Sequence, residues 1–139
     1  MAKRITEVMS ANPCAIDADK PVAYAAQMMK EEDVGLAPVV EGDRLVGALT
    51  DRDIVTRVVA EGRDPQSVPV REVASKDLVT IDPQQDLDEA LRLMASYQVR
   101  RLPVVEDDGR LVGVVAQADV AREAKDKQTG QLVEDISRA

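Results

Sequence analysis

Two nearly identical stretches of sequence decide the fold. Residues 38–47 read PVVEGDRLVG, and residues 103–113 read PVVEDDGRLVG. The two stretches match at an offset of 65 residues and, after one inserted residue, at an offset of 66. Self-similarity at a fixed period is the signature of repeat architectures. The chain therefore contains an internal duplication.

The duplication continues on both sides of these stretches, over almost the whole chain. Its further matches are Glu7-Val8 with Glu72-Val73, Ile16-Asp17 with Ile81-Asp82, Met29 with Met94, and Asp53 with Asp119. A register held over this distance, with a single insertion at a turn, identifies two copies of one structural unit.

Each copy predicts the same order of elements: strand, helix, strand, strand, helix. Apolar residues recur at helical spacing in both copies, at Val22, Ala25, Ala26 and Met29 and again at Leu87, Ala90, Leu91 and Met94. Pro21 is typical of a first helical turn, and Asp86 followed by Glu89 predicts a capping box. The strands are predicted at residues 14–16, 36–40 and 44–49 in copy one, with a hairpin at residues 41–43.

The fold class is therefore mixed α/β (α+β), with two β-α-β-β-α units. A sheet of three strands cannot bury its apolar face alone, so the two copies should pack as one pseudo-two-fold module. We assign residues 1–62 to the first motif, 63–69 to a linker, 70–125 to the second motif and 126–139 to a tail. Leu132, Val133 and Ile136 allow a short amphipathic helix in that tail, and a tail without fixed structure is the alternative.

Composition excludes several classes of function. The net charge of -8 opposes binding to the phosphate backbone of nucleic acids. No apolar run has the length of a membrane span or a signal peptide, which predicts a cytoplasmic protein without membrane partners. The chain has no His and a single Cys, which argues against zinc or haem and excludes catalysis that depends on His.

The element order and the sequence motifs resemble the CBS (cystathionine beta-synthase) domain. The resemblance is carried by Ala37-Pro38-Val39-Val40 and by Gly47 through Thr50-Asp51-Arg52-Asp53, and in copy two by Arg101-Leu102-Pro103-Val104. It covers roughly residues 5–125, so the chain resembles a tandem pair of CBS domains. As a free-standing pair it is similar to the bacterial hypoxic response proteins.

This resemblance implies a regulatory protein and not an enzyme. Such pairs bind adenine-containing ligands such as AMP, ATP, NAD or S-adenosylmethionine in clefts between the two motifs. It also implies a homodimer that packs through its helices, for which the apolar run Ile54 to Val59 is the expected interface. With no effector domain in this sequence, the signal would pass to a protein partner or to a change in self-association.

The resemblance also implies the binding residues. Asp53 would hold the ribose, with the Thr50 hydroxyl beside it, and Asp119 takes the same position in copy two, where Ala116 replaces the hydroxyl. The full set is Ile16, Pro38, Val39, Gly47, Thr50, Asp51, Arg52 and Asp53 in copy one, and Arg100, Arg101, Pro103 and Asp119 in copy two.

Each of these assignments has a structural alternative. Thr50 and Asp53 also form an N-cap pattern, in which the hydroxyl caps a helix and the acid stabilises its first turn. Arg52 either reaches a phosphate or neutralises its acidic neighbours. Arg100 and Arg101 either meet the phosphates of a ligand held by copy one or form surface ion pairs. In the alternative function, the chain is a scaffold for dimerisation or protein interaction, and its clefts are vestigial.

Overall fold

The computed structural model describes residues 3–11 and 13–123. The predicted tail, with its possible helix, and the last two residues of the predicted second motif lie outside the described residues. Contacts divide the chain into two compact units. The Thr50 unit comprises Asn12–Leu78 and Val105–Val112, and the Arg100 unit comprises Met1–Ala11, Val79–Val104 and Gly113–Ala139.

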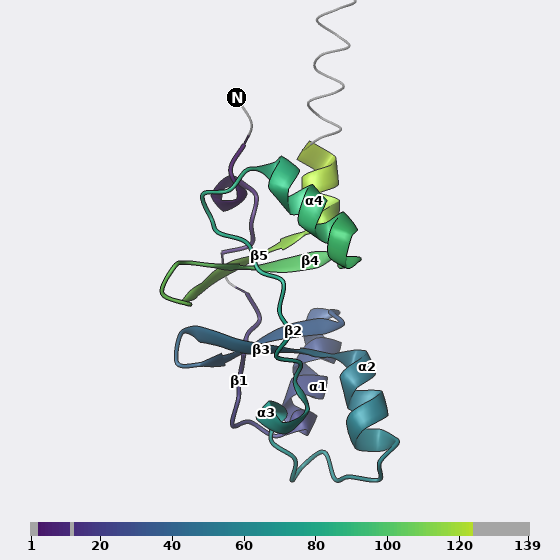
Figure 1. The fold of residues 1–139 in the computed structure, drawn as a ribbon. Helices are drawn as coiled ribbons and strands as arrows, with labels where there is room; N and C mark the ends of the chain where they lie inside the picture. The colour runs from purple at the N-terminus through teal and green to yellow at the C-terminus, as the bar shows by residue number, and fades with distance from the viewer. Residues whose placement is uncertain (1–2, 12, 124–139) are drawn as a thin grey trace, which may run out of the picture. The chain divides into compact units, whose positions relative to one another are not determined.

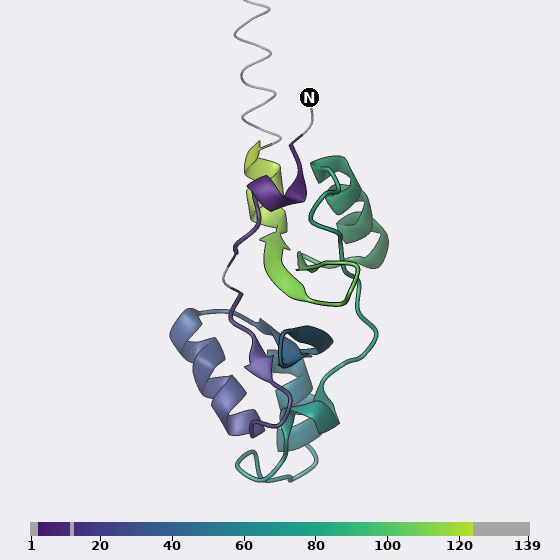
Figure 2. The same cartoon turned by 90° about the vertical axis from the view of Figure 1, so that its left-hand side faces the viewer.

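The Thr50 unit is a three-stranded sheet with helices on one face (Figures 1 and 2). Its elements are β1 (Ile16–Asp17), α1 (Val22–Glu32), β2 (Leu36–Glu41), β3 (Arg44–Thr50), α2 (Asp51–Ile54), the π-helix η2 (Val55–Val59) and α3 (Val70–Val73). The strand order is β1-β2-β3, with β1 parallel and β3 antiparallel to β2. Gly42 opens the predicted hairpin turn with a φ of 65°, which favours glycine.

The Arg100 unit repeats this plan. Its elements are the short helix η1 (Ile5–Glu7), α4 (Leu87–Tyr97), most of β4 (Arg101–Val105) and of β5 (Leu111–Ala116), and a helix that begins at residue 117 and is described to residue 123. The end of β4 at Val105 and the start of β5 at Leu111 and Val112 belong to the Thr50 unit. Figure 2 shows α4 and this last helix on one face of the β4–β5 sheet. The predicted mixed α+β fold, with tandem units, is confirmed.

Local differences from the predicted elements have physical causes. The run Leu78 to Ile81 predicts a strand in copy two, but only Ile81 pairs, in a single bridge to Val104 of β4. Tertiary context therefore overrides strand propensity here. Pro21 is the N-cap of α1 and not part of its first turn. Asp86 caps α4 by accepting the backbone N–H of Glu89 at 3.0 Å.

The predicted capping box at α4 is therefore only half formed. The Glu89 carboxylate turns to Arg92, one helical turn on, with an Oε2 to Nε distance of 2.9 Å. This hydrogen bond lowers the pKa of Glu89. The carboxylate binds Arg92 instead of the backbone N–H of Asp86, because a glutamate and an arginine at i and i+3 attract each other through opposite charges.

In each unit, a strand pairs with the segment that begins the other sequence repeat. In the Thr50 unit, Ser75 pairs with Ala48 of β3 through backbone hydrogen bonds of 2.8 and 2.9 Å. In the Arg100 unit, Ser10 pairs with Val114 of β5 through bonds of 2.9 and 3.1 Å. The compact unit and the sequence repeat are thus different divisions of the chain.

The core of each unit is aliphatic. The Thr50 unit buries, among others, Ile16, Val22, Val39, Leu49, Val58 and Val70. The Arg100 unit buries Ile5, Ile81, Ala90, Met94, Leu102, Val104, Val115 and Val120. Among residues 3–11 and 13–123, no helix combines the length and the apolar character needed to cross a bilayer.

The packing of the N-terminal segment against β5 can be tested at Gly113. A Cβ at this position would lie 2.8 Å from the Ser10 carbonyl oxygen and 2.7 Å from the Met9 sulfur. We expect Gly113→Ala to lower the free energy of unfolding by about 1–3 kcal/mol, because the Ser10 backbone must move. Urea denaturation measures the change.

The corresponding glycine of copy one supplies the comparison. A Cβ at Gly47 would lie 3.0 Å from the Ser75 carbonyl oxygen, so Gly47→Ala should destabilise less than Gly113→Ala. Glycine in a strand is otherwise unfavourable, and its replacement in open space would add stability. An increase in stability for Gly113→Ala would contradict the packing described.

Candidate functional site

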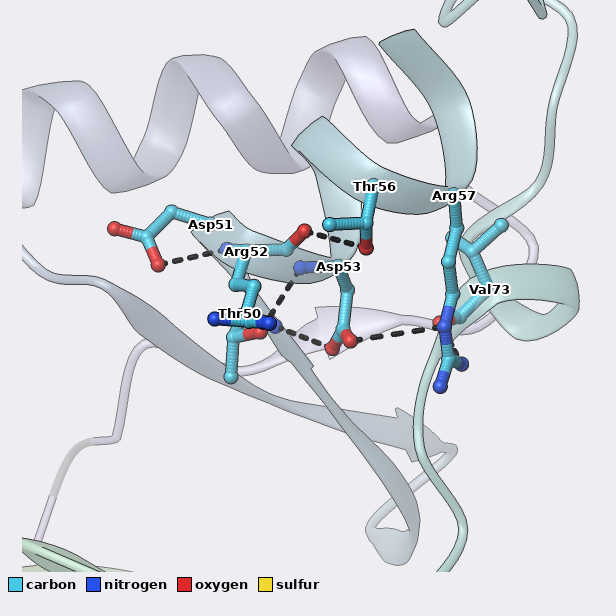
Figure 3. Close-up of polar contacts among 7 residues, drawn as sticks. All are labelled: Thr50, Asp51, Arg52, Asp53, Thr56, Arg57 and Val73. Atoms are coloured by element: carbon cyan, nitrogen blue, oxygen red, sulfur yellow. Dashed lines mark hydrogen bonds and ion pairs between the residues drawn. The ribbon is translucent and has the colours of Figure 1, made fainter. Parts of the chain in front are cut away.

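The junction between β3 and α2 carries the predicted acid and hydroxyl. Thr50 is the last residue of β3 and the N-cap of α2, with an extended backbone. Its hydroxyl accepts the backbone N–H of Asp53 at 3.1 Å, and Asp53 Oδ2 accepts the backbone N–H of Thr50 at 3.0 Å (Figure 3). The N-cap pattern predicted from the sequence is confirmed as a reciprocal capping box.

Arg57 approaches the second oxygen of this carboxylate. Its Nε lies 3.8 Å from Asp53 Oδ1, and its Nη1 donates to the carbonyl oxygen of Val73 at 3.0 Å (Figure 3). The Asp53 side chain is 15% exposed. The Thr50 N–H therefore fixes the orientation of the Asp53 carboxylate through Oδ2. Oδ1 makes only the long contact to Arg57 and keeps lone pairs that can accept a further hydrogen bond.

Sequence reasoning did not single out Arg57. The available signal is the spacing of Asp53 and Arg57, because opposite charges at i and i+4 face one another on a helix. The π-helical turn that follows α2 was not predicted. Within it the Thr56 hydroxyl donates to the Arg52 carbonyl at 2.8 Å, a back-bond of the kind that often bends helices.

Asp51 and Arg52 lie at the start of α2. The Asp51 N–H donates to the Gly35 carbonyl at 3.0 Å, and its carboxylate accepts the N–H of Arg52 at 2.8 Å. Gly35 leaves room for that carboxylate, since a Cβ there would lie 3.1 Å from Asp51 Oδ2. Within the described residues the Arg52 guanidinium has no ion-pair partner, so its phosphate role stays a prediction.

The other predicted binding residues of copy one belong to the core. Ile16 and Val39 face one another in the β1–β2 ladder and are each 1% exposed, and Pro38 is also buried. A Cβ at Gly47 would lie 3.0 Å from the Ser75 carbonyl oxygen, so the backbone of Ser75 occupies the space beside this glycine. Contact of these four residues with a ligand remains a prediction.

A hollow of about 390 Å³ opens elsewhere in the Thr50 unit. It is lined by Val39, Glu41, Val46, Arg71, Ala74 and Lys76. Arg71 donates to Asp19 at 3.0 Å and to Glu41 at 2.7 Å, and these hydrogen bonds raise the pKa of Arg71. The guanidinium is thus already neutralised by two carboxylates.

The corresponding junction of the Arg100 unit differs in its side chains. Ala116 ends β5 where Thr50 ends β3, and Asp119 forms an ion pair with Arg122 at 3.3 Å. Arg100 and Arg101 line a hollow of about 520 Å³ together with Leu91, Ala116, Gln117, Ala118 and Ala121. Pro103 is buried in β4. The predicted residues of copy two thus fall at a hollow, in the core and on a helix.

Comparison with known proteins gives the family. The family model of the CBS domain matches residues 5–60 and 70–126. The chain is a pair of CBS domains. The resemblance stated from the sequence is therefore confirmed.

Two relatives of this CBS domain pair are of similar length to it. CBS domain-containing protein YhcV of Bacillus subtilis is 41% identical over 134 residues, which cover 96% of this chain and 94% of the relative. Hypoxic response protein 1 of Mycobacterium tuberculosis is 37% identical over 131 residues, which cover 94% and 91%. The similarity to hypoxic response proteins is also confirmed.

Two solved structures share the fold of the CBS domain pair. The crystal structure of Hypoxic Response Protein I, with two coordinated zinc ions, has a TM-score of 0.79 and 38% identity, and covers 86% of this chain and 98% of that one. The CBS domain pair of protein MJ0100, in complex with 5′-methylthioadenosine and S-adenosyl-L-methionine, has a TM-score of 0.78 and 23% identity, with coverage of 91% and 99%.

The solved structure of Hypoxic Response Protein I contains zinc, so the residues of the present chain that could bind a metal are of interest. The present CBS domain pair contains no His and one Cys, the side chains that zinc sites use most. In the part of the chain that the structure describes, no cluster of three or more His, Cys, Asp or Glu side chains could hold a metal ion.

The capping box predicts a specific stability effect at Thr50. We expect Thr50→Ala to lower the free energy of unfolding by about 1 kcal/mol, because the Asp53 N–H loses its side-chain acceptor. Thr50→Ser keeps the hydroxyl and should retain most of the stability. Urea denaturation of the two variants and the parent tests this, and equal loss in both variants would show that the hydroxyl does not cap α2.

Proposed function

We propose that this CBS domain pair is a regulatory module that binds an adenine nucleotide, such as AMP, ATP or NAD, without catalysing a reaction. The observation that carries the proposal is the Asp53 carboxylate at the β3–α2 junction. A carboxylate is the natural acceptor for the two hydroxyl groups of a ribose. In this proposal Asp53 grips the sugar and Thr50 supports it.

The capping box is compatible with this role. Thr50 N–H uses one lone pair of Asp53 Oδ2, and Arg57 makes only a 3.8 Å contact to Oδ1. A carboxylate offers about four acceptor sites, so capacity remains for a ribose diol. A carboxylate that is already fixed in direction loses little conformational freedom when the ligand binds, which favours affinity.

The fold itself is able to hold adenosine derivatives. The CBS domain pair of protein MJ0100 was crystallised with 5′-methylthioadenosine and S-adenosyl-L-methionine. At 23% identity this likeness concerns the fold alone, so it supports the ligand class through architecture and not through shared residues. The choice among nucleotides rests on the side chains of the present chain.

A regulatory output follows from binding without chemistry. A ligand that prefers one conformation of the pair shifts the population toward it by its difference in affinity. The change would pass to a protein partner or to self-association, in the cytoplasm, where adenine nucleotides are abundant. Relatives with high identity over the full chain carry CBS or hypoxic response names and no enzyme name.

The role of Asp53 can be tested by a nearly isosteric change. Asp53→Asn removes the charge but keeps a carbonyl oxygen to accept the Thr50 N–H, so the cap should survive. We expect nucleotide affinity to fall on the order of 10- to 100-fold, since a hydrogen bond to a charged group contributes about 1.5–3 kcal/mol. Isothermal titration calorimetry with AMP, ATP and NAD measures the loss.

Glu61→Gln is the matched control, because Glu61 is exposed in the same unit and the variant loses the same charge. Its affinity should equal that of the parent. Thermal unfolding supplies a second readout: a ligand at 100 times its dissociation constant adds about 2.7 kcal/mol of stability. Parent-like nucleotide affinity in Asp53→Asn would refute the assignment.

A second candidate function is a scaffold for dimerisation or protein interaction that needs no ligand. The reciprocal hydrogen bonds of Thr50 and Asp53 favour it, because they give both side chains a structural task. In that case no adenine compound would raise the thermal stability of the parent. A rise with any of AMP, ATP or NAD would exclude a purely structural role.

We also propose that the chain forms a homodimer through the helix that follows Thr50. Val55 and Val59 of η2 are 58% and 63% exposed, while Val58 between them is fully buried. Two large apolar side chains one turn apart on a helix form a surface that association would cover.

Val59→Lys tests this interface. Burying an unpaired ammonium is unfavourable, so the variant should shift from dimer to monomer in sedimentation velocity at micromolar concentration. Gln66→Lys, which adds the same charge at an exposed turn, should leave the dimer intact. A parent that sediments as a monomer, or a Val59→Lys variant that remains dimeric, would contradict the proposal.

A further inference from the structure

The guanidinium group of Arg57 lies between two acceptors in the Thr50 unit (Figure 3). Its Nη1 donates to the carbonyl oxygen of Val73 at 3.0 Å, and its Nε lies 3.8 Å from Asp53 Oδ1. The first contact is a hydrogen bond, and the second is an ion pair that is too long to be one. Arg57 is therefore anchored on Val73 and drawn toward Asp53 by charge alone.

The Val73 carbonyl needs this partner because α3 ends at Val73. The last carbonyls of a helix have no partner within it, and the residue that follows has an extended backbone, with a φ of -70° and a ψ of 145°. Two residues further on, Ser75 exchanges backbone hydrogen bonds with Ala48 of β3. Arg57 thus helps to hold residues 73–75, the crossing segment, against the sheet.

The Arg100 unit makes the corresponding connection without its acid. The position of Arg57 is taken in copy two by Glu123, at the offset of 66 residues. Glu123 forms an ion pair with Lys3 at 2.9 Å, whereas Asp119 pairs with Arg122 at 3.3 Å. Lys3 belongs to the N-terminal segment that pairs with β5. The acid and the segment are therefore connected through one side chain only in the Thr50 unit.

Arg57 and the proposed ligand use the same carboxylate oxygen. Oδ2 of Asp53 already accepts the Thr50 N–H at 3.0 Å, so Oδ1 is the oxygen with more free capacity. A ribose hydroxyl that donates to Oδ1 takes up the negative charge that attracts Arg57. Ion pairs between half-exposed side chains are weak, so a hydroxyl donor at hydrogen-bond distance displaces the guanidinium group.

We propose that Arg57 couples the Asp53 site to the crossing segment, so that a ligand bound at Asp53 loosens the contact of that segment with β3. The identity of the ligand rests on the proposed function, whereas the coupling rests on the contacts of Arg57. Coupling between two equilibria is reciprocal, so the docked segment must also oppose ligand binding. Arg57 is a positioning residue that keeps the segment docked while Asp53 is unoccupied.

Amide hydrogen exchange in ¹⁵N-labelled full-length protein measures the crossing contact directly. The N–H groups of Ser75 and Ala48 exchange when this contact opens, and those of Ser10 and Val114 report the equivalent contact of the Arg100 unit. A ratio of the two pairs removes the general stabilisation that any ligand causes. We expect saturating AMP to lower the relative protection of the first pair about 2-fold, the size of one ion pair at i and i+4.

Two variants test the coupling without any ligand. Asp53→Asn removes the charge that attracts Arg57, and we expect it to lower the relative protection of Ser75 and Ala48 about 2-fold. In the Arg57→Gln background the same substitution should have no further effect, because the connection is already broken. If Arg57 only satisfied the Val73 carbonyl, Asp53→Asn would act equally in both backgrounds.

The Arg57→Gln variant also tests the reciprocal effect on the ligand. AMP should no longer change the relative protection of the β3 contact in this variant, and its affinity by calorimetry should rise about 2-fold because the competing cation is gone. Lys30→Gln is the matched control, since it removes a positive charge from an exposed position on α1 in the same unit. Its relative protection and its response to AMP should equal those of the parent.

The outcomes separate this inference from the proposed function. An additive double-mutant cycle, or an equal loss of protection in Lys30→Gln, would overturn the coupling whether or not AMP binds. AMP binding that leaves the relative protection of the parent unchanged, or changes it equally in Arg57→Gln, would overturn the coupling and leave the nucleotide function intact. A non-additive cycle in a protein that binds neither AMP, ATP nor NAD would support the coupling and refute the nucleotide function.

Discussion

The structure depends on the completion of each sheet by a segment from the other repeat. The Ser75 backbone closes β3 at Ala48, and the Ser10 backbone closes β5 at Val114. Both contacts favour a glycine on the strand: a Cβ at Gly113 would collide with the incoming backbone, and a Cβ at Gly47 would meet it in tight contact. A single repeat would leave this strand edge and its apolar face exposed to water, which explains why the motif is duplicated.

Arg57 links the segment contributed by the second repeat to the candidate site. Arg57 connects the Asp53 carboxylate with the carbonyl of Val73, and Val73 ends α3, the helix that opens the second repeat. Asp53, the side chain proposed to hold a sugar, is therefore linked through Arg57 to Val73, which lies in the segment that completes the sheet of the Thr50 unit. A ligand that draws Asp53 Oδ1 away from Arg57 acts on that connection directly.

The sequence predicted what is local and periodic. The repeat, the helices of residues 22–32 and 87–97, the hairpin at Gly42 and the cap at Thr50 all follow from spacing and turn chemistry. Pairing between distant segments was beyond such reasoning. The match of Glu7-Val8 with Glu72-Val73 marks two equivalent segments, but no periodicity states which core each segment joins.

The site was predictable to the same degree. Thr50 and Asp53 belong to a short motif with a fixed local geometry, so their contact was foreseeable. The spacing of Asp53 and Arg57 indicates that the two side chains share a helix face, but the π-helical turn that carries Arg57 was not predictable from composition. The hollow beside Arg100 depends on which residues surround it in space, and only Arg100, Arg101 and Ala116 of its lining residues were singled out for the site from the sequence.

The comparison of the two junctions shows the same backbone contact with different side chains around it. The hydrogen bonds from Asp51 to Gly35 and from Gln117 to Arg100 are both retained, because an unpaired backbone group in the interior is costly whatever side chain it bears. The side chains of Asp51, Arg100 and Gln117 are exposed, so this constraint does not apply to them. The two repeats therefore share the backbone contact at this place, while the side chains around it differ in charge.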